Sequence, residues 1–298
     1  MSKFYYKLYG LNIESEVECN ELIKSEKSND DIKISFGKVP ENIKKLIKKD
    51  WFGYTTDKIM WLYIEDVAIY YIFNGTNIII EKQQDNVDMY DIKAYLLGTA
   101  LGIILIQRNS IAIHGGTILI DNKAITIVGD SGAGKSTLTS ALRIKGYPFM
   151  ADDVSVLSDN KVNFSYPQQK LCRDAMKKLG YDIKNYNMID DDREKFAIPV
   201  KDNFIMELNK LNAIFEIAVT DSNEEVSFEE IKGSEKLNVF LKNVYRIEVA
   251  KIVGINPIYF KKCLDIVSDI NMYRIKRPDG KFSVSNQIEL IENIVKNI

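Results

Sequence analysis

The segment Gly129-Asp-Ser-Gly-Ala-Gly-Lys-Ser-Thr137 fits the pattern G-x-x-x-x-G-K-[ST], with Gly129, Gly134, Lys135 and Ser136 in the fixed places. Glycines let the backbone turn tightly, so that its N–H groups can point at phosphate oxygens. Lys135 would reach the β- and γ-phosphates of a nucleoside triphosphate, and the Ser136 hydroxyl would ligate Mg²⁺. The residues predicted to contact the nucleotide are Gly129, Asp130, Ser131, Gly132, Ala133, Gly134, Lys135, Ser136 and Thr137.

The flanking sequence supplies the context that this motif requires. Residues 124–128 form a short apolar run rich in β-branched side chains, which is typical of a buried strand. Residues 138–145 have helical periodicity and end before Gly146 and Pro148, which predicts a helix followed by a new strand. A strand, a loop and a helix in this order predict an α/β fold. The alternative is a glycine turn that binds nothing, and the context makes it the weaker interpretation.

Composition limits the classes of protein to consider. The chain has 298 residues, is 46% hydrophobic and 28% charged, and carries a net charge of −2, so it can form one large domain or two modest ones. This charge gives no sign of a nucleic-acid partner. Cys19, Cys172 and Cys263 are far apart, which favours reduced thiols in a cytoplasmic protein. The first residues lack the apolar core of a signal peptide.

One apolar segment, Ala94–Ile106, resembles part of a membrane helix and contains Gly98 and Gly102 at GxxxG spacing. It has 13 residues, whereas a helix that spans a bilayer needs about 20. We therefore expect a buried helix at about residues 91–107 and no membrane partner.

The chain divides into two parts by pattern. Residues 1–88 are predicted to form a small β-rich domain, with strands at 32–36, 60–64, 68–73 and 77–81 and a hairpin turn at Asn74-Gly75. A short amphipathic helix is predicted at 40–51. We expect this domain to serve substrate binding or oligomerisation.

Residues 89–298 are predicted to form the nucleotide-binding domain. Its expected strands lie near 111–114, 117–120, 154–157, 211–219 and 271–275, with a terminal helix from about 286. Residues 158–210 look polar and irregular. Their acidic stretch 190–192 is interpreted as a solvated loop and not as a metal site.

Three further residues could turn phosphate binding into catalysis. His114, the single histidine, lies 21 residues before Lys135, and Asp152 and Asp153 lie 17 and 18 residues after it. A carboxylate just beyond the strand that follows the loop helix can hold Mg²⁺ or accept a proton from an attacking hydroxyl. Taken alone, the histidine could be a core residue and the aspartates a turn.

Three segments together resemble a known family. They are residues 108–116 around His114, the phosphate loop, and Gly146-Tyr-Pro-Phe-Met-Ala-Asp152-Asp153. They resemble the catalytic half of the HPr serine kinase/phosphorylase family, and the lasso-peptide kinases of ribosomal-peptide clusters are similar to the same core. Segments 167–171 and 194–199 more loosely resemble the peptide-kinase branch. The resemblance implies a P-loop kinase core of the HPr kinase type, a mixed sheet with flanking helices, beside the β-rich N-terminal domain.

The resemblance also implies roles for the matching residues. Lys135 would neutralise the transferring phosphate, and Ser136 would hold Mg²⁺. Asp153 would be the general base toward a serine hydroxyl, with Asp152 beside the metal, although these two roles could be exchanged. His114 would line the site near the γ-phosphate. The implied cofactors are ATP and Mg²⁺.

Two departures from the family matter. The loop ends in Lys-Ser-Thr137, where the bifunctional enzymes usually have Lys-Ser-Glu, and the later Glu-containing Gly-rich signature has no match. We therefore expect a kinase without the reverse phosphorylase activity. Lys170, Lys195 and Arg246 are candidate phosphate or substrate contacts, and the alternative for each is an ordinary exposed cation.

The leading hypothesis is thus an ATP- and Mg²⁺-dependent kinase acting on a serine of a peptide or small protein. The acceptor could instead be a hydroxy amino acid or another small alcohol. A second class is a nucleotide-binding regulatory module that transfers phosphate to nothing. A transport ATPase is disfavoured because no L-S-G-G-Q-like segment follows the loop. The family resemblance also implies a homo-oligomer.

Overall fold

The computed structural model describes residues 2–47, 51–190, 194–200 and 202–298. The chain forms two compact units, Met1–Ile111 with Arg246–Phe260, and Ala112–Tyr245 with Lys261–Ile298. This division differs from the boundary predicted at residue 88. The reason is that the helical stretch after residue 88 belongs with the strands before it, as the hydrogen bond from the Tyr70 phenol to the Ile92 carbonyl illustrates.

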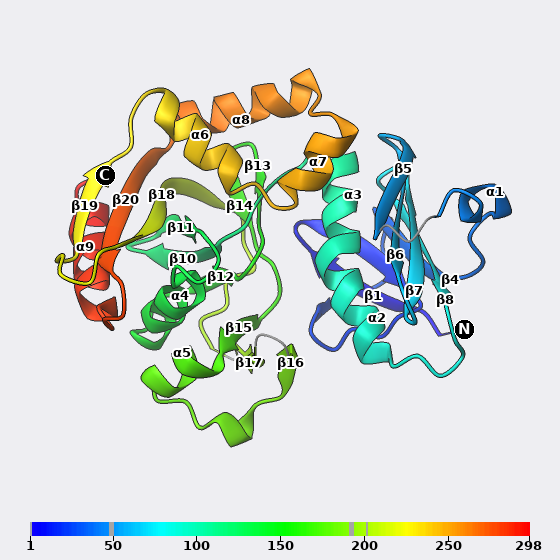
Figure 1. The fold of residues 1–298 in the computed structure, drawn as a ribbon, viewed down its shortest axis with the longest axis horizontal. Helices are drawn as coiled ribbons and strands as arrows, with labels where there is room; N and C mark the ends of the chain where they lie inside the picture. Colours follow the sequence, from blue (N-terminus) through cyan, green and yellow to red (C-terminus); the bar gives the residue numbers. More distant parts are fainter. Residues whose placement is uncertain (1, 48–50, 191–193, 201) are drawn as a thin grey trace. The chain divides into compact units, whose positions relative to one another are not determined.

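The first unit is built on an eight-stranded sheet, coloured blue to cyan in Figure 1. Its strand order is β3-β1-β2-β4-β8-β7-β6-β5. β2, β4 and β8 run parallel to one another, and the remaining neighbours are antiparallel. The strands are β1 (Phe4–Leu8), β2 (Leu11–Ser15), β3 (Ile23–Lys24), β4 (Ile32–Phe36), β5 (Phe52–Thr56), β6 (Ile59–Ile64), β7 (Ala68–Phe73) and β8 (Asn77–Lys82).

All four strands predicted in this region are present, as β4, β6, β7 and β8. Asn74 and Gly75 join β7 to β8 with φ angles of 58° and 65°, the left-handed conformation that a tight hairpin turn requires. Over the described residues the predicted helix at 40–51 is wrong in extent, since α1 covers Glu41–Lys44, and residues 48–50 of the prediction lie outside the described residues. Ile43 is the one side chain that α1 buries, so a longer helix would gain little by packing here.

The helical stretch of the first unit consists of α2 (Met89–Tyr95), a π-helical turn η1 (Leu96–Ala100) and α3 (Leu101–Gln107). Its 19 residues are long and apolar enough to cross a membrane by length and composition alone, and half of its most apolar part is buried within the protein. The core helix of a soluble protein has the same properties. The 13-residue apolar run was expected to be too short for a membrane span, but the helical stretch that contains it has 19 residues. Helix length therefore does not exclude a membrane span. A further helix, α7 (Ile247–Val253), completes this unit.

The second unit contains a nine-stranded sheet whose central strand is β18 (Asn209–Thr220). β11 (Lys123–Gly129) and β20 (Asn271–Pro278) flank β18 and run parallel to it. The other strands are β9 (Ile111–Ile113), β10 (Gly116–Ile120), β12 (Phe149–Ala151), β13 (Ser155–Ser158), β14 (Lys161–Asn163) and β19 (Ser227–Glu230). The strands predicted near 111–114, 117–120, 124–128, 154–157, 211–219 and 271–275 are thus confirmed.

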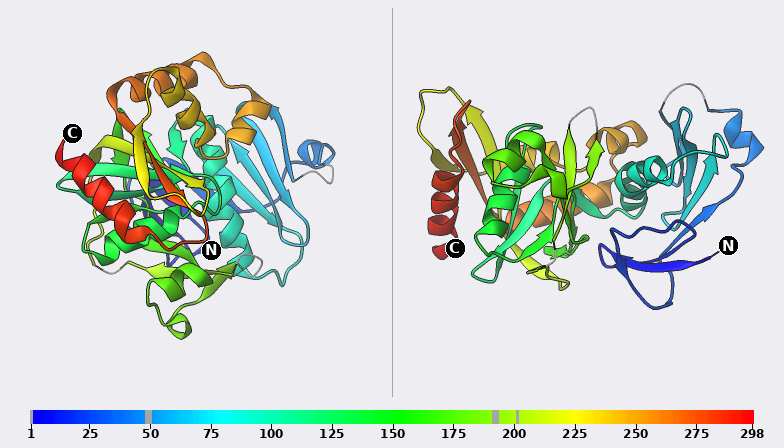
Figure 2. Two further views of the ribbon diagram at one scale, coloured as in Figure 1. Left: turned by 60° about the vertical axis from the view of Figure 1, so that its left-hand side comes forward. Right: turned by 90° about the horizontal axis from the view of Figure 1, so that it is seen from below.

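One face of this sheet is covered by α4 (Lys135–Ile144) and α9 (Val284–Lys296), which pack side by side (Figure 2). Leu138 and Leu142 of α4 meet Phe215 of β18 and Ile291 of α9 in one buried apolar cluster. The other helices among the described residues are α5 (Arg173–Lys178), the 3₁₀ turn η2 (Ile183–Asn185), α6 (Ser234–Lys242) and α8 (Pro257–Asp269).

The region 158–210, predicted to be irregular, instead contains a three-stranded antiparallel sheet. Its strands are β15 (Gln168–Cys172), β17 (Lys195–Pro199) and β16 (Met188–Asp190), with β17 in the centre. Leu171, Met176 and Phe196 form its small core. The prediction failed because these apolar residues are separated by long polar stretches and meet only in the fold. Of the predicted acidic loop, Asp191 and Asp192 lie outside the described residues.

Candidate functional site

The phosphate-loop motif lies between β11 and α4, so the predicted order of strand, loop and helix is confirmed. Gly129, Gly132 and Gly134 have φ angles of 138°, 80° and 106°, which side-chain-bearing residues rarely adopt. A Cβ atom on Gly129 would lie 2.6 Å from the Ile217 carbonyl oxygen. The loop conformation therefore depends on glycine at this position.

Two cations hold the carbonyl groups of the loop. Lys135 Nζ donates to the carbonyl oxygens of Gly129 and Asp130 at 2.7 and 3.0 Å. Arg277 of β20 donates from Nε to the Ala133 carbonyl at 2.7 Å and from Nη2 to that of Gly132 at 3.3 Å. With these carbonyls engaged, the N–H groups of the first turn of α4 remain available for an anion, as at other helix N-termini.

Asn243, just after α6, ties the loop to the strand that carries the histidine. Its side-chain oxygen accepts the Gly129 N–H at 3.0 Å, and its backbone oxygen accepts the His114 N–H at 2.7 Å. The side chain is buried, and its nitrogen donates to the Val239 carbonyl at 2.8 Å. A second tie is the ion pair at 2.8 Å between Lys242 and Asp130.

Sheet topology explains why residues 152 and 153 lie near the loop. β10 is antiparallel to both β11 and β12, so β11 and β12 point the same way and their carboxyl ends share one edge. Ligands of α/β sheets bind at this edge. Below it, the buried Thr117 hydroxyl contacts the hydroxyls of Thr126 and Ser155 at 2.8 and 2.7 Å, which fixes β13 against β10 and β11.

Asp153 is the centre of a charged cluster. His114 Nε2 lies 3.2 Å from its Oδ1, and Lys170 Nζ lies 3.1 Å from its Oδ2. Burial alone would raise the pKa of Asp153, but the Lys170 charge and the His114 hydrogen bond outweigh burial and hold that pKa well below its usual range. The proximity of Tyr166 and then of Asp153 raises the pKa of Lys170, against the effect of burial. Asp153 is therefore a carboxylate and Lys170 a cation at neutral pH.

Asp152 has a different environment although it is the next residue. Its side chain is 6% exposed, and Oδ2 accepts the backbone N–H of Lys170 at 2.8 Å. Burial, with the nearby negative charge of Asp153, raises the pKa of Asp152 to about 6. The φ angle of 64° at Asp153, in the left-handed region, lets the chain turn sharply between the two side chains.

Two of the predicted lysines lie close to this cluster. Burial lowers the pKa of Lys135, while Asp153 and Asp130 oppose that change. Lys195 of β17 pairs with Cys172 of β15, and its charge acts on both Lys135 and Asp152. The structure thus brings together His114, Lys135, Asp152, Asp153, Lys170 and Lys195, which are up to 81 positions apart in sequence.

Arg246, the third predicted substrate contact, belongs to the first unit. Its Nη2 donates to the Thr99 hydroxyl at 2.7 Å, and Nη1 lies 3.6 Å from Glu248. These contacts do not place Arg246 in the cluster around Asp153, so a role in substrate binding stays a prediction.

The residues present can accommodate Mg²⁺ only with help from a substrate. Among the described residues there is no group of three or more His, Cys, Asp or Glu side chains suited to a metal. Mg²⁺ commonly uses one or two protein ligands, substrate phosphates and water. Ser136, in the first turn of α4, and one of the two aspartates fit that smaller set.

Sequence reasoning missed Asn243, Lys242 and Arg277. None lies in a recognisable motif, and each reaches the loop from more than 100 positions away. For Arg277 a partial signal existed, since it lies near the end of a predicted strand, and strand ends in α/β sheets gather at the ligand edge.

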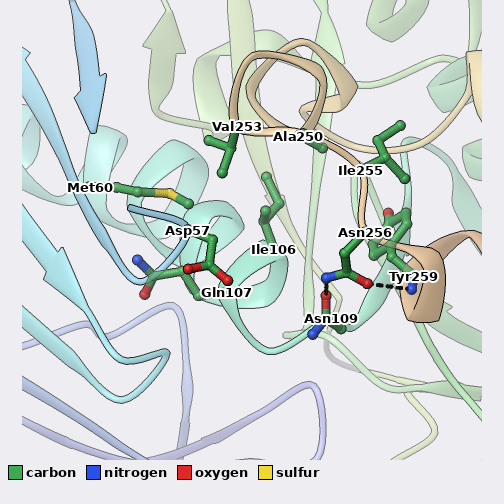
Figure 3. A pocket seen from close by; sticks show the side chains of 11 residues that line it. Asp57, Met60, Ile106, Gln107, Asn109, Ala250, Val253, Ile255, Asn256 and Tyr259 are labelled. Carbon is green, nitrogen blue, oxygen red and sulfur yellow. Dashed lines mark hydrogen bonds between the residues drawn. The ribbon is translucent and has the colours of Figure 1, made fainter. Parts of the chain in front are cut away.

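The first unit has a small pocket of its own, lined by residues from α3, the β5–β6 turn and the segment 250–259 (Figure 3). The Asn256 amide nitrogen donates to Asn109 Oδ1 at 2.5 Å, and Asn256 Oδ1 accepts the Tyr259 N–H at 2.8 Å. None of the predicted site residues lines this pocket.

Comparison with solved structures gives distant likenesses. No protein-family model matches the chain, and no curated protein matches it. Among solved structures, the Hpr(Ser) kinase/phosphatase from Coxiella burnetii is similar at 16% sequence identity and a TM-score of 0.31, over 62% of this chain and 94% of that one. A likeness at this identity and score is too distant to carry a functional conclusion.

Proposed function

We propose that this protein is an ATP- and Mg²⁺-dependent kinase that phosphorylates a serine hydroxyl of a peptide or small protein. The observation that carries the proposal is the placement of Asp153. This carboxylate is held by His114 and Lys170 and lies close enough to the phosphate-loop lysine, Lys135, to act on its pKa. The sequence resemblance to serine kinases of the HPr type supplies the choice of serine.

The environments of the two aspartates support a division of their roles. Asp153 is the general base, because its side chain is 29% exposed and stays ionised beside the phosphate loop. Asp152 is a positioning residue on the metal side, because its side chain is buried and holds the backbone of Lys170. A partly exposed, ionised carboxylate can contact an incoming hydroxyl more readily than a buried one.

In the proposed step, the serine oxygen attacks the γ-phosphorus while the bond to the β-phosphate oxygen breaks. ADP leaves, and the hydroxyl proton passes to Asp153 and then to water. Transition states of phosphoryl transfer are loose, so positioning and charge stabilisation contribute most and a weak base is sufficient. Lys135 and the N–H groups of the first turn of α4 stabilise the phosphate charge.

Ser136 and Asp152 would hold Mg²⁺ when it is bound, and the ion would neutralise part of the phosphate charge. Lys170 and Lys195, on the three-stranded sheet, add positive charge near Asp152 and Asp153, where an anionic acceptor segment or a phosphate can be attracted.

The test is phosphoryl transfer by the purified protein to serine peptides, including peptides encoded beside its gene, in the presence of ATP and Mg²⁺. The expected result is a mass gain of one phosphate, which Asp153→Asn abolishes. Asp159→Asn is the matched control, since Asp159 is exposed and has a similar φ angle of 46°. Full transfer by Asp153→Asn would refute the base role.

Other outcomes favour other functions. Phosphorylated free hydroxy amino acids with unmodified peptides indicate a small-molecule kinase. Tight nucleotide binding without any phosphorylated product indicates a regulatory nucleotide-binding module. We further propose a cytoplasmic homo-oligomer in which the first unit serves acceptor binding or self-association, and light scattering of the full chain tests the oligomer.

A further inference from the structure

A pocket in the second unit borders the phosphate loop and takes no part in the charged cluster. It is lined by Gly132, Ala133, Gly134 and Thr137 on one side. The opposite side comes from one face of α5, including Ala175 and Lys178, and from residues 277–287 between β20 and the first turn of α9. His114, Asp152, Asp153 and Lys170 do not line it.

We propose that this pocket holds the nucleoside half of the triphosphate, with the base against Phe282. The inference rests on the proposed function, because it needs the triphosphate to lie in the loop. Lys135 of such a loop reaches the β- and γ-phosphates, so the γ-phosphate lies toward the cluster around Asp153. The α-phosphate and the nucleoside must then leave toward the loop tip and the first turn of α4, where the pocket lies.

The chemistry of the pocket suits a planar aromatic ligand. Phe282 is 47% exposed, and Lys178 Nζ lies 5.8 Å from the centre of the Phe282 ring. Ala175, which is largely buried, also lines the pocket and adds an apolar contact. Any nucleobase can stack on an exposed aromatic ring, so stacking supplies affinity without selecting one base over another.

Polar groups around this apolar surface can contact the ribose and the edge of the base. Arg277 orders the pocket side of the loop through the Ala133 carbonyl. Lys281 and Asp174 also line the pocket and offer a donor and an acceptor. A mostly apolar surface with a few convergent polar groups is typical of small-ligand sites.

The first test compares two probes, ATP and inorganic tripolyphosphate, by titration calorimetry. Phe282→Ala should weaken ATP binding about tenfold and change tripolyphosphate binding less than twofold, since stacking contributes only to the nucleoside. Phe228→Ala is the matched control, because Phe228 is 48% exposed on β19 and does not line the pocket. It should leave both affinities unchanged.

Equal weakening of both probes, or no effect on either, would overturn the proposed pocket while leaving the phosphate site intact. If wild-type protein binds neither probe, the proposed kinase function fails together with the pocket. The two failures are therefore distinguishable.

A second test uses a natural reporter. Cys172 is exposed and lines the pocket, whereas Cys19 and Cys263 are buried. Alkylation of the wild-type protein by N-ethylmaleimide, followed by intact mass, should give a single fast adduct. Saturating ATP should slow the alkylation of Cys172 severalfold more than saturating tripolyphosphate does. Equal protection by the two probes would overturn the proposal.

Discussion

The ammonium nitrogen of Lys170 lies 3.1 Å from Oδ2 of Asp153, so the candidate base has a cationic partner within the protein itself. The same residue donates its backbone N–H to Asp152. Lys170 therefore sets the charge of one aspartate with its side chain and the position of the other with its backbone. A side-chain substitution can remove the first effect and leave the second.

Lys170→Met is expected to raise the pKa of Asp153, because the positive charge that favours the carboxylate is lost. The acid limb of the pH–rate profile should therefore move to higher pH. Lys170→Arg keeps the positive charge, so its acid limb should lie at the same pH as that of the wild type. Lys177→Met, on the exposed side of α5, is the control. An unchanged acid limb in Lys170→Met would contradict the assigned interaction.

Lys135→Ala should weaken triphosphate binding by about ten- to a hundredfold, since hydrogen bonds from a charged donor contribute about 1.5–3 kcal/mol. Calorimetry with ATP measures the change. Lys145→Ala, at the other end of α4 and paired with Glu292, should bind ATP as the wild type does. If the wild type, Lys135→Ala and Lys145→Ala all bound ATP with the same affinity, the loop would hold no phosphate.

Asp152→Asn should stabilise the protein at alkaline pH. The pKa of Asp152 is about 6 in the folded protein and 3.8 ordinarily, so its contribution to stability is fully present below pH 3.8 and lost as pH rises through 6. A shift of this size corresponds to about 3 kcal/mol. Asparagine can still accept the Lys170 N–H, and it does not ionise.

Urea unfolding without nucleotide and with a chelator tests this prediction. The variant should be more stable than the wild type at pH 8, and the difference should shrink toward pH 4. The opposite trend, or an equal loss of stability at both pH values, would show that the Asp152 carboxylate is stabilising in the fold.

Gly129→Ala and Gly132→Ala should differ in stability although both residues have positive φ. Alanine at 129 would clash with the Ile217 carbonyl at 2.6 Å, whereas nothing lies within 4 Å of the position a Cβ would take at 132. Gly132→Ala should therefore cost about 1–2 kcal/mol from backbone strain alone, and Gly129→Ala clearly more. Thermal melting measures both, and equal losses would contradict the assigned contact.

The sequence by itself determined the phosphate loop and its setting. Local patterns decide these features: glycines at fixed spacing, a β-branched run before them and a helical period after them. The same local rules located the hairpin at Asn74-Gly75 and part of the strands of each unit, but missed β1–β3 and β15–β17. Asp152 and Asp153 were candidates because they follow the strand after the loop helix, and the family resemblance implied the role of His114.

Only the tertiary structure decided how those residues are held. Lys170 reaches Asp153 from β15, Asn243 reaches Gly129 from the end of α6, and Arg277 reaches Ala133 from β20. It also separated the two aspartates, one buried and one ionised, and placed the helical stretch 89–107 with the first unit. These contacts join distant positions whose pairing depends on strand order and direction, which local periodicity does not encode.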